Sequence, residues 1–324
     1  MRLGPVLLCA GSIASAMSTA MEDPHATVVS QACMESRRRV TGEFVNGQIK
    51  DAEAALAGVL AGARSGHERS CTAVIMCDLA SILFGWGRLA EAEIFAERAV
   101  RTFDKDRRPD DPVFLHPLEV LISVRFEQGK TGRARQAFNR LQSVRTERPE
   151  ESGPVHSLAG VLLEAEGRLP EAHAEYSAAL TDWHQAGLSE SAEAAAVLTN
   201  LACLYIKQRR WDDARQVLER ALAIFASCKY ATALDQVKAL NFRAVLHSRQ
   251  REWREAARDL QDAISIVDAD ARLDPASIAF VFSNYVNVLR KTHRRREARS
   301  IEARLATFRR TDPAQAVVDV TELR

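Results

Sequence analysis

Residues 195–228 have the sequence AAVLTNLACLYIKQRRWDDARQVLERALAIFASC, which predicts two amphipathic helices joined by a polar turn. Apolar side chains recur three and four residues apart on both sides of the turn, as on one face of an α-helix. Alanines stand where the two backbones must approach most closely, with Ala202 on the first helix and Ala214 and Ala221 on the second. The stretch therefore predicts a closely packed antiparallel helix pair.

The alanine of the second helix recurs along the chain at a nearly constant interval. Successive members are 40, 42, 38, 42, 42 and 42 residues apart. Such a period indicates an internal repeat in which each helix pair packs only on its neighbours. The column consists of Ala52, Ala92, Ala134, Ala172, Ala214, Ala256 and Ala298.

A second column lies in the turn between the two helices of each pair. Its first four members are glycines, which suit a left-handed backbone at the end of a helix. The last three repeats must turn without a glycine. The column consists of Gly47, Gly87, Gly129, Gly167, Arg209, Arg251 and His293.

These columns resemble the tetratricopeptide repeat (TPR). The string Asn200-Leu201-Ala202 followed by Tyr205 is most similar to the longer, 42-residue repeats of the kinesin light chain type. The resemblance covers nearly the whole chain and implies an all-α fold, a right-handed α-solenoid of about seven antiparallel helix pairs. We expect the solenoid to span residues 30–310 and a C-terminal tail to follow at 311–324. The repeats are expected to start near residues 33, 73, 115, 153, 195, 237 and 279.

The N-terminus has the outline of a secretory signal peptide. The positive charge of Arg2 precedes an apolar run that ends in small residues at alternate positions. We expect residues 1–20 to form the signal, with cleavage after Ala16 or Ala20. An uncleaved membrane anchor is the alternative, but the run is shorter than the about 20 apolar residues that span a bilayer. The sequence therefore predicts an exported protein, periplasmic or extracellular, with no membrane span after cleavage.

The overall composition argues against a nucleic-acid-binding protein. The formal net charge of the 324 residues is +1, so no strong global field attracts a polyanion. The chain is 47% hydrophobic but only 6% aromatic, as expected where alanine and leucine pack helices in layers. We expect no nucleic-acid partner.

The motifs that most resemble chemical sites have a structural explanation. Residues 85–90 have the outline of a dinucleotide-binding turn, but no predicted strand precedes them. Residues 129–131 are similar to the end of a phosphate loop whose first glycine is missing. Both segments contain a turn glycine of the repeat, and HExxH, Cys-x-x-Cys and GxSxG motifs do not occur. We therefore expect a protein that is not an enzyme and has no catalytic residues, metal site or cofactor.

Five cysteines remain after removal of the predicted signal. Cys77 and Cys203 have apolar neighbours and are expected to be buried thiols. Cys33 and Cys71 each stand at the start of a first helix in consecutive repeats, which makes them the candidate disulfide. The bridge would tie down the first repeat, whose first helix is unusually polar.

The resemblance implies that the first helices line a concave groove that holds a protein or peptide partner. Cations near the ends of the last three first helices suit an acidic peptide or a C-terminal carboxylate, and asparagines can hydrogen-bond a peptide backbone. The alternative is that the cations only complement the helix dipoles and solvate the surface. The candidate groove residues are Asn200, Lys207, Asn241, Arg249, Asn284, Asn287 and Lys291.

Two other roles stay open at the level of sequence. The convex face could serve self-assembly or a structural function. The basic last helix pair could bind an acidic polymer or an anionic lipid, although a solvated cap is the simpler interpretation of a terminal repeat. Its cations are Arg290, Lys291, Arg294, Arg295, Arg296, Arg299, Arg304, Arg309 and Arg310.

Overall fold

The computed structural model describes residues 31–45, 55, 58–59, 66–146, 148–228 and 231–308. The predicted signal peptide, the second helix expected around Ala52 and the tail at 311–324 lie outside these residues. Within them the backbone forms thirteen α-helices and one short 3-10 helix, with no strand, so the predicted all-α class is confirmed. None of the described helices is both long and apolar enough to cross a membrane.

The helices divide into two compact units, each of which packs helices in chain order. In the N-terminal unit α5 packs on α6 and α6 packs on α7. A 3-10 turn precedes α6 because the carboxylate of Asp111 accepts a hydrogen bond from the N–H of Val113. The elements of this unit are α2 (Gln31–Val45), α4 (Gly66–Gly85), α5 (Leu89–Phe103), η2 (Pro112–Phe114), α6 (Leu115–Glu127) and α7 (Thr131–Leu141).

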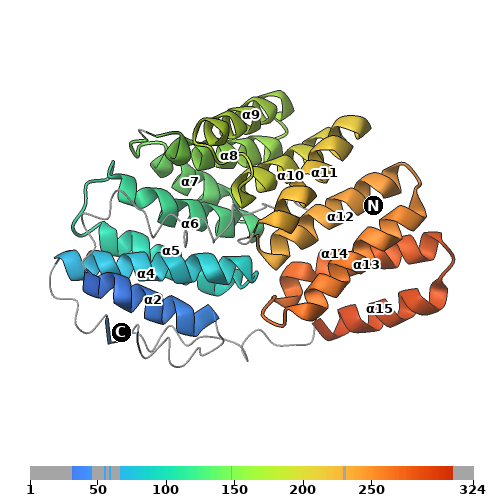
Figure 1. Cartoon of the computed structure of the whole chain (residues 1–324), viewed down its shortest axis with the longest axis horizontal. Helices are drawn as coiled ribbons and strands as arrows, with labels where there is room; N and C mark the ends of the chain where they lie inside the picture. Colours follow the sequence, from blue (N-terminus) through green and yellow to red (C-terminus); the bar gives the residue numbers. More distant parts are fainter. Residues whose placement is uncertain are drawn as a thin grey trace. The chain divides into compact units, whose positions relative to one another are not determined.

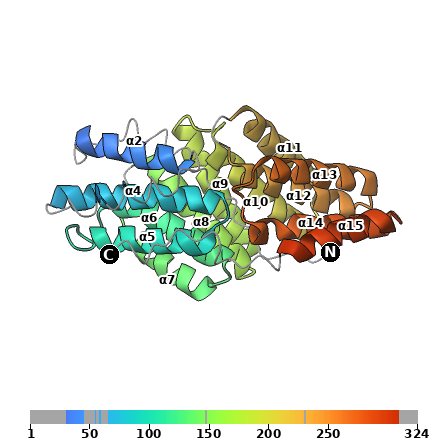
Figure 2. The same cartoon turned by 90° about the horizontal axis from the view of Figure 1, so that it is seen from below.

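The C-terminal unit is a stack of antiparallel helix pairs, which are drawn from green to red in Figures 1 and 2. The first helices of neighbouring pairs also contact each other, α8 with α10, α10 with α12 and α12 with α14. This arrangement is the predicted α-solenoid. Its helices are α8 (Pro149–Ala165), α9 (Leu169–Gln185), α10 (Ala192–Lys207), α11 (Trp211–Ser227), α12 (Ala233–Arg249), α13 (Trp253–Ala269), α14 (Pro275–Lys291) and α15 (Arg295–Phe308).

The alanine column is buried inside the pairs. All six members in the described ranges are at most 2% exposed: Ala92, Ala134, Ala172, Ala214, Ala256 and Ala298. On α8 the facing small residue is Gly160, and a Cβ built there would lie 2.5 Å from Cε1 of Tyr176 on α9. Small residues are therefore required by the close approach of the helices.

The six described members of the turn column share one backbone conformation, whether or not they are glycine, and Gly47 lies outside the described residues. Gly87, Gly129 and Gly167 have φ values of 76°, 74° and 78°. The three non-glycine turns also use the left-handed region, which costs a residue with a Cβ about 1–2 kcal/mol. Their φ values are 61° for Arg209, 65° for Arg251 and 61° for His293.

Candidate functional site

The predicted groove residues lie on three successive first helices of the C-terminal unit. These helices, α10, α12 and α14, contact one another in chain order. Asn200 and Lys207 are on α10, Asn241 and Arg249 on α12, and Asn284, Asn287 and Lys291 on α14.

A hydrogen bond between asparagines sets the register of α12 against α14. Nδ2 of Asn284 donates to Oδ1 of Asn241 at 2.7 Å. Arg249 follows Asn241 by eight residues and Lys291 follows Asn284 by seven. At about 1.5 Å of rise per residue, both cations lie about 10–12 Å beyond the asparagine pair. The register therefore places Arg249 and Lys291 at the same level of neighbouring helices.

Asn200 does not reach the surface. Its side chain is completely buried on α10, and neither its Oδ1 nor its Nδ2 has a hydrogen-bond partner among the described residues. A buried amide without partners costs about 1–3 kcal/mol. In this conformation no ligand can touch Asn200 without moving its neighbours.

Lys207 forms an ion pair with a buried carboxylate. Its Nζ lies 2.7 Å from Oε1 of Glu164 on α8, and the Glu164 side chain is 0% exposed. The other oxygen of Glu164 accepts a hydrogen bond from the hydroxyl of Tyr176 at 2.9 Å. A buried carboxylate needs such partners because its loss of hydration is costly. Lys207 therefore neutralises an internal charge, a role that its position in the repeat does not reveal.

Four other candidates lie together at the surface, whereas Asn241 is buried. Arg249, Asn287 and Lys291 are exposed, and Asn284 is half-buried. Asn284, Asn287 and Lys291 share one face of α14, since they are three and four residues apart. This face borders α12, because Asn284 bonds to Asn241. We call Arg249, Asn284, Asn287 and Lys291 the first-helix surface.

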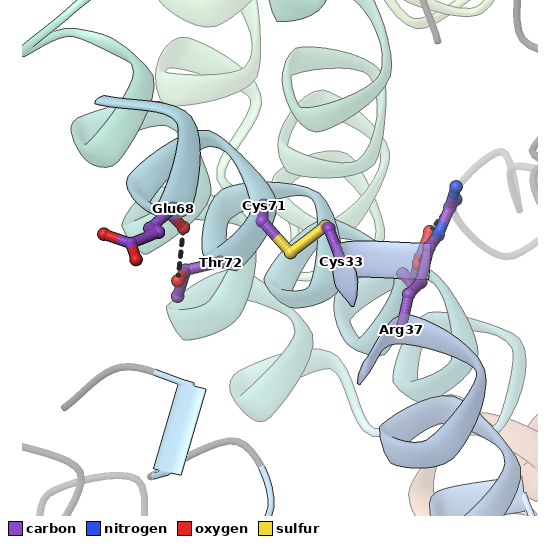
Figure 3. Close-up of a disulfide and its surroundings, with 6 residues drawn as sticks. Cys33, Arg37, Glu68, Cys71 and Thr72 are labelled. Atoms are coloured by element: carbon purple, nitrogen blue, oxygen red, sulfur yellow. Dashed lines mark hydrogen bonds and ion pairs between the residues drawn. A yellow bond between two sulfur atoms is a disulfide. The ribbon is translucent and has the colours of Figure 1, made fainter. Parts of the chain in front are cut away.

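In the N-terminal unit, a disulfide joins α2 to α4. Figure 3 shows the bond between Cys33 and Cys71, whose Cα atoms are 5.7 Å apart. Beside it, Nη2 of Arg37 lies 2.7 Å from Oδ1 of the buried Asp78 on α4. The bridged cysteines are 38 residues apart, and a loop of that order typically adds about 2–4 kcal/mol of stability. The two contacts together anchor the polar helix α2.

A cluster in the same unit has the order of groups found in a catalytic triad. Oγ of Ser81 on α4 lies 3.0 Å from Nε2 of His116 on α6, and Nδ1 of His116 lies 3.7 Å from a carboxylate oxygen of Glu119. Motif reasoning missed the cluster because its serine and histidine are 35 residues apart and come from two helices.

Burial argues against nucleophilic chemistry in this cluster. Ser81 is 2% exposed within α4, and its hydroxyl donates to the carbonyl oxygen of Cys77 at 3.0 Å. Burial also raises the pKa of the Cys77 thiol, against the opposing effect of His116, so the thiol stays protonated at neutral pH. In the described part of the chain no group of three or more histidine, cysteine or acidic side chains could hold a metal ion.

Comparison with known proteins identifies the repeat. Residues 153–227 match the model of the tetratricopeptide repeat family. No curated protein matches the sequence.

Solved structures of known proteins share the fold. BtubC (BKLC) from P. vanneervenii is 24% identical, with 69% of this chain and 91% of that chain covered and a TM-score of 0.51. A Rap protein complexed with Competence and Sporulation Factor is 14% identical, with coverages of 89% and 76% and a TM-score of 0.57. The apo form of RapI is 12% identical, with coverages of 86% and 98% and a TM-score of 0.59. At these identities the likeness concerns the fold alone.

Proposed function

Because this chain is a tetratricopeptide repeat protein, we propose that it binds another protein and catalyses no reaction. Proteins of this repeat family are generally non-catalytic scaffolds. A stack of helix pairs presents the same side of successive helices next to one another, which gives an extended surface for a partner. A Rap protein of the same fold was solved with a bound factor, which supports a binding role.

The first-helix surface is the part of the stack that we propose for partner binding. The observation that carries this proposal is the bond between Asn284 and Asn241, which aligns the exposed cations Arg249 and Lys291. Packed helices are about 8–10 Å apart. Residues three apart in a polyproline II segment are on the same side and about 9 Å apart. An extended segment with two acidic residues at that spacing would meet both cations.

The exposed amides complete the proposed site. Each cation in water contributes only a few tenths to about 1 kcal/mol, whereas micromolar affinity needs about 8 kcal/mol. Asn287 is exposed and Asn284 is half-buried, so both can hydrogen-bond the backbone of a bound segment. The charges would select an acidic segment, and the amides would hold it independently of sequence.

Capture of partners by the exported protein tests this function. The wild-type protein, immobilised as the bait, is compared with the double variant Arg249→Glu, Lys291→Glu. The control is Arg38→Glu, Arg133→Glu, which changes the net charge by the same amount but in the N-terminal unit. We expect the first variant to retain at least about tenfold less partner than wild type and control. Equal retention by all three would rule out the first-helix surface. Failure of the wild-type bait to retain any partner would contradict the binding function.

Export is part of the same proposal. The apolar N-terminal run favours it, and the disulfide between Cys33 and Cys71 supports it because disulfides persist in oxidising compartments. Intact mass of the fractionated protein tests it. We expect a mature chain starting at Met17 or Met21 in the periplasm or medium, and a full-length cytoplasmic chain would contradict the proposal.

A further inference from the structure

Positive charge concentrates at the turn between α14 and α15. Residues 290–299 contain six lysine and arginine residues and one carboxylate, although the whole chain has a net charge of only +1. Arg290 and Arg294 form ion pairs with Glu302 and Glu297. The other three arginines of this segment are exposed and have no ion-pair partner among the described residues. We call them the α15 arginine cluster: Arg295, Arg296 and Arg299.

In contrast to these three arginines, Arg304 on the same helix contacts the preceding helices. Arg304 pairs with Asp268 on α13, and its guanidinium carbon lies 4.7 Å from the ring centroid of Phe282 on α14. Arg304 therefore helps to attach α15 to the preceding helices. The α15 arginine cluster has no such contact in the described part of the chain.

The arrangement of the cluster disfavours the folded state. Arg299 lies four residues after Arg295 and three after Arg296, so the three guanidinium groups are neighbours on the helix surface and repel one another. Arg295 and Arg296 also stand in the first turn of α15, where the helix dipole is already positive. A bound polyanion would relieve both effects.

We propose that the α15 arginine cluster docks an acidic segment of a protein. The planar guanidinium groups of arginine pair with carboxylates through two parallel hydrogen bonds. Side chains three or four residues apart on a helix have Cβ atoms about 5–6 Å apart. Same-side residues of an extended chain are about 6.7 Å apart. A segment with acidic residues at alternate positions therefore matches the cluster.

The described surface has few of the side chains that bind the other polyanions, which are anionic membranes and single-stranded nucleic acids. Its one exposed large hydrophobic side chain is Ile94, which belongs to the N-terminal unit. Membrane-surface helices insert large apolar side chains into the bilayer, and single-stranded nucleic acids stack on exposed aromatic rings. Neither kind of group accompanies the cluster among the described residues. This site goes beyond the first-helix surface, because α15 is the second helix of its pair and contributes none of that surface.

The test measures binding of the mature full chain to poly-L-glutamate of about 20 residues at low salt. We expect Arg295→Glu, Arg296→Glu, Arg299→Glu to weaken binding at least about tenfold, and 500 mM NaCl to do the same to the wild type. The charge-matched control Arg38→Glu, Lys105→Glu, Arg133→Glu keeps the wild-type affinity within about twofold. The corresponding triple glutamine variant replaces the glutamate variant if circular dichroism shows that the latter is unfolded.

Three results would overturn the proposal. One is unchanged binding by the folded triple variant, and another is an equal loss in the control, which would mean that only net charge matters. The third is tighter binding, through the same arginines, of phosphatidylglycerol vesicles or of a single-stranded oligonucleotide. The triple variants keep Arg249 and Lys291 unchanged, so a loss of binding in them does not bear on the first-helix surface.

Discussion

Lys207 on α10 forms an ion pair with Glu164 on α8, with 2.7 Å between Nζ and Oε1. Because of this pair, Lys207 differs from Arg249 and Lys291, which occupy equivalent positions in the next two repeats but are exposed. The cation that recurs near the end of the first helix therefore has two different physical roles. In α10 the cation neutralises a buried carboxylate, whereas in α12 and α14 the cation is exposed.

Replacing Lys207 with methionine should destabilise the fold. Glu164 is 0% exposed, and a buried charge that loses its partner typically costs about 3–5 kcal/mol. We expect urea unfolding of Lys207→Met to show a loss of about 3 kcal/mol. The control Lys291→Met removes an exposed cation and should change stability by less than about 0.5 kcal/mol. Similar losses in both variants would show that the ion pair is not structural.

Gly160→Ala should overpack the contact between α8 and α9. The added Cβ would meet the ring of Tyr176, which is fully buried and whose hydroxyl donates to Glu164. We expect a net loss of about 1–2 kcal/mol in chemical unfolding. Gly132→Ala on α7 is the control, because its Cβ would have no atom within 4 Å. It should be neutral or stabilising by helix propensity, and a loss there as large as at Gly160 would contradict the packing argument.

Arg251→Gly should stabilise the turn between α12 and α13. Arg251 has a φ of 65°, a conformation that glycine adopts without strain. We expect a gain of about 0.5–1 kcal/mol, since glycine also makes the unfolded chain more flexible. The reverse change, Gly167→Ala, should cost about 1 kcal/mol because φ is 78° there. A shift of the melting temperature in the same direction for both variants would contradict the shared left-handed turn.

Asp235 should make stability depend on pH. Burial raises its pKa to about 6 from the ordinary 3.8, against the opposing effects of Lys238 and Thr232. The folded state therefore binds the proton more tightly than the unfolded state, so the group favours folding below pH 4 and loses that contribution as pH rises through 6. The loss is at most about 3 kcal/mol. Between pH 4 and 7 the free energy of unfolding of the wild type should fall by up to this amount relative to that of Asp235→Asn. A difference between the two proteins that does not depend on pH would refute the assignment.

The repeat could be predicted from sequence because close backbone approach restricts single positions. Ala92, Ala134 and their equivalents must be small, so their period identifies the helix pairs. The left-handed turn could be predicted where it holds glycine. It could not be predicted at Arg209 or His293, where packing of the flanking helices imposes the same conformation on a residue with a Cβ.

The candidate site was harder to predict, because exposure depends on neighbouring helices. Asn200 and Asn284 occupy similar places in their repeats, but the former is completely buried and the latter is half-buried. The partner of Lys207 is 43 residues away on another helix. Periodicity identified the first helix of each repeat, whereas the exposure of its side chains could be seen only in the packed structure.

Site-specific photo-crosslinking of the protein in its native cells tests the central claim most directly. A benzophenone side chain replaces Asn287 on the first-helix surface of α14 or, as the matched control, the exposed Gln216 on α11. We expect irradiation to join one defined partner protein to the Asn287 variant and none to the Gln216 variant. Crosslinking from Gln216 with none from Asn287 would contradict binding through the first-helix surface.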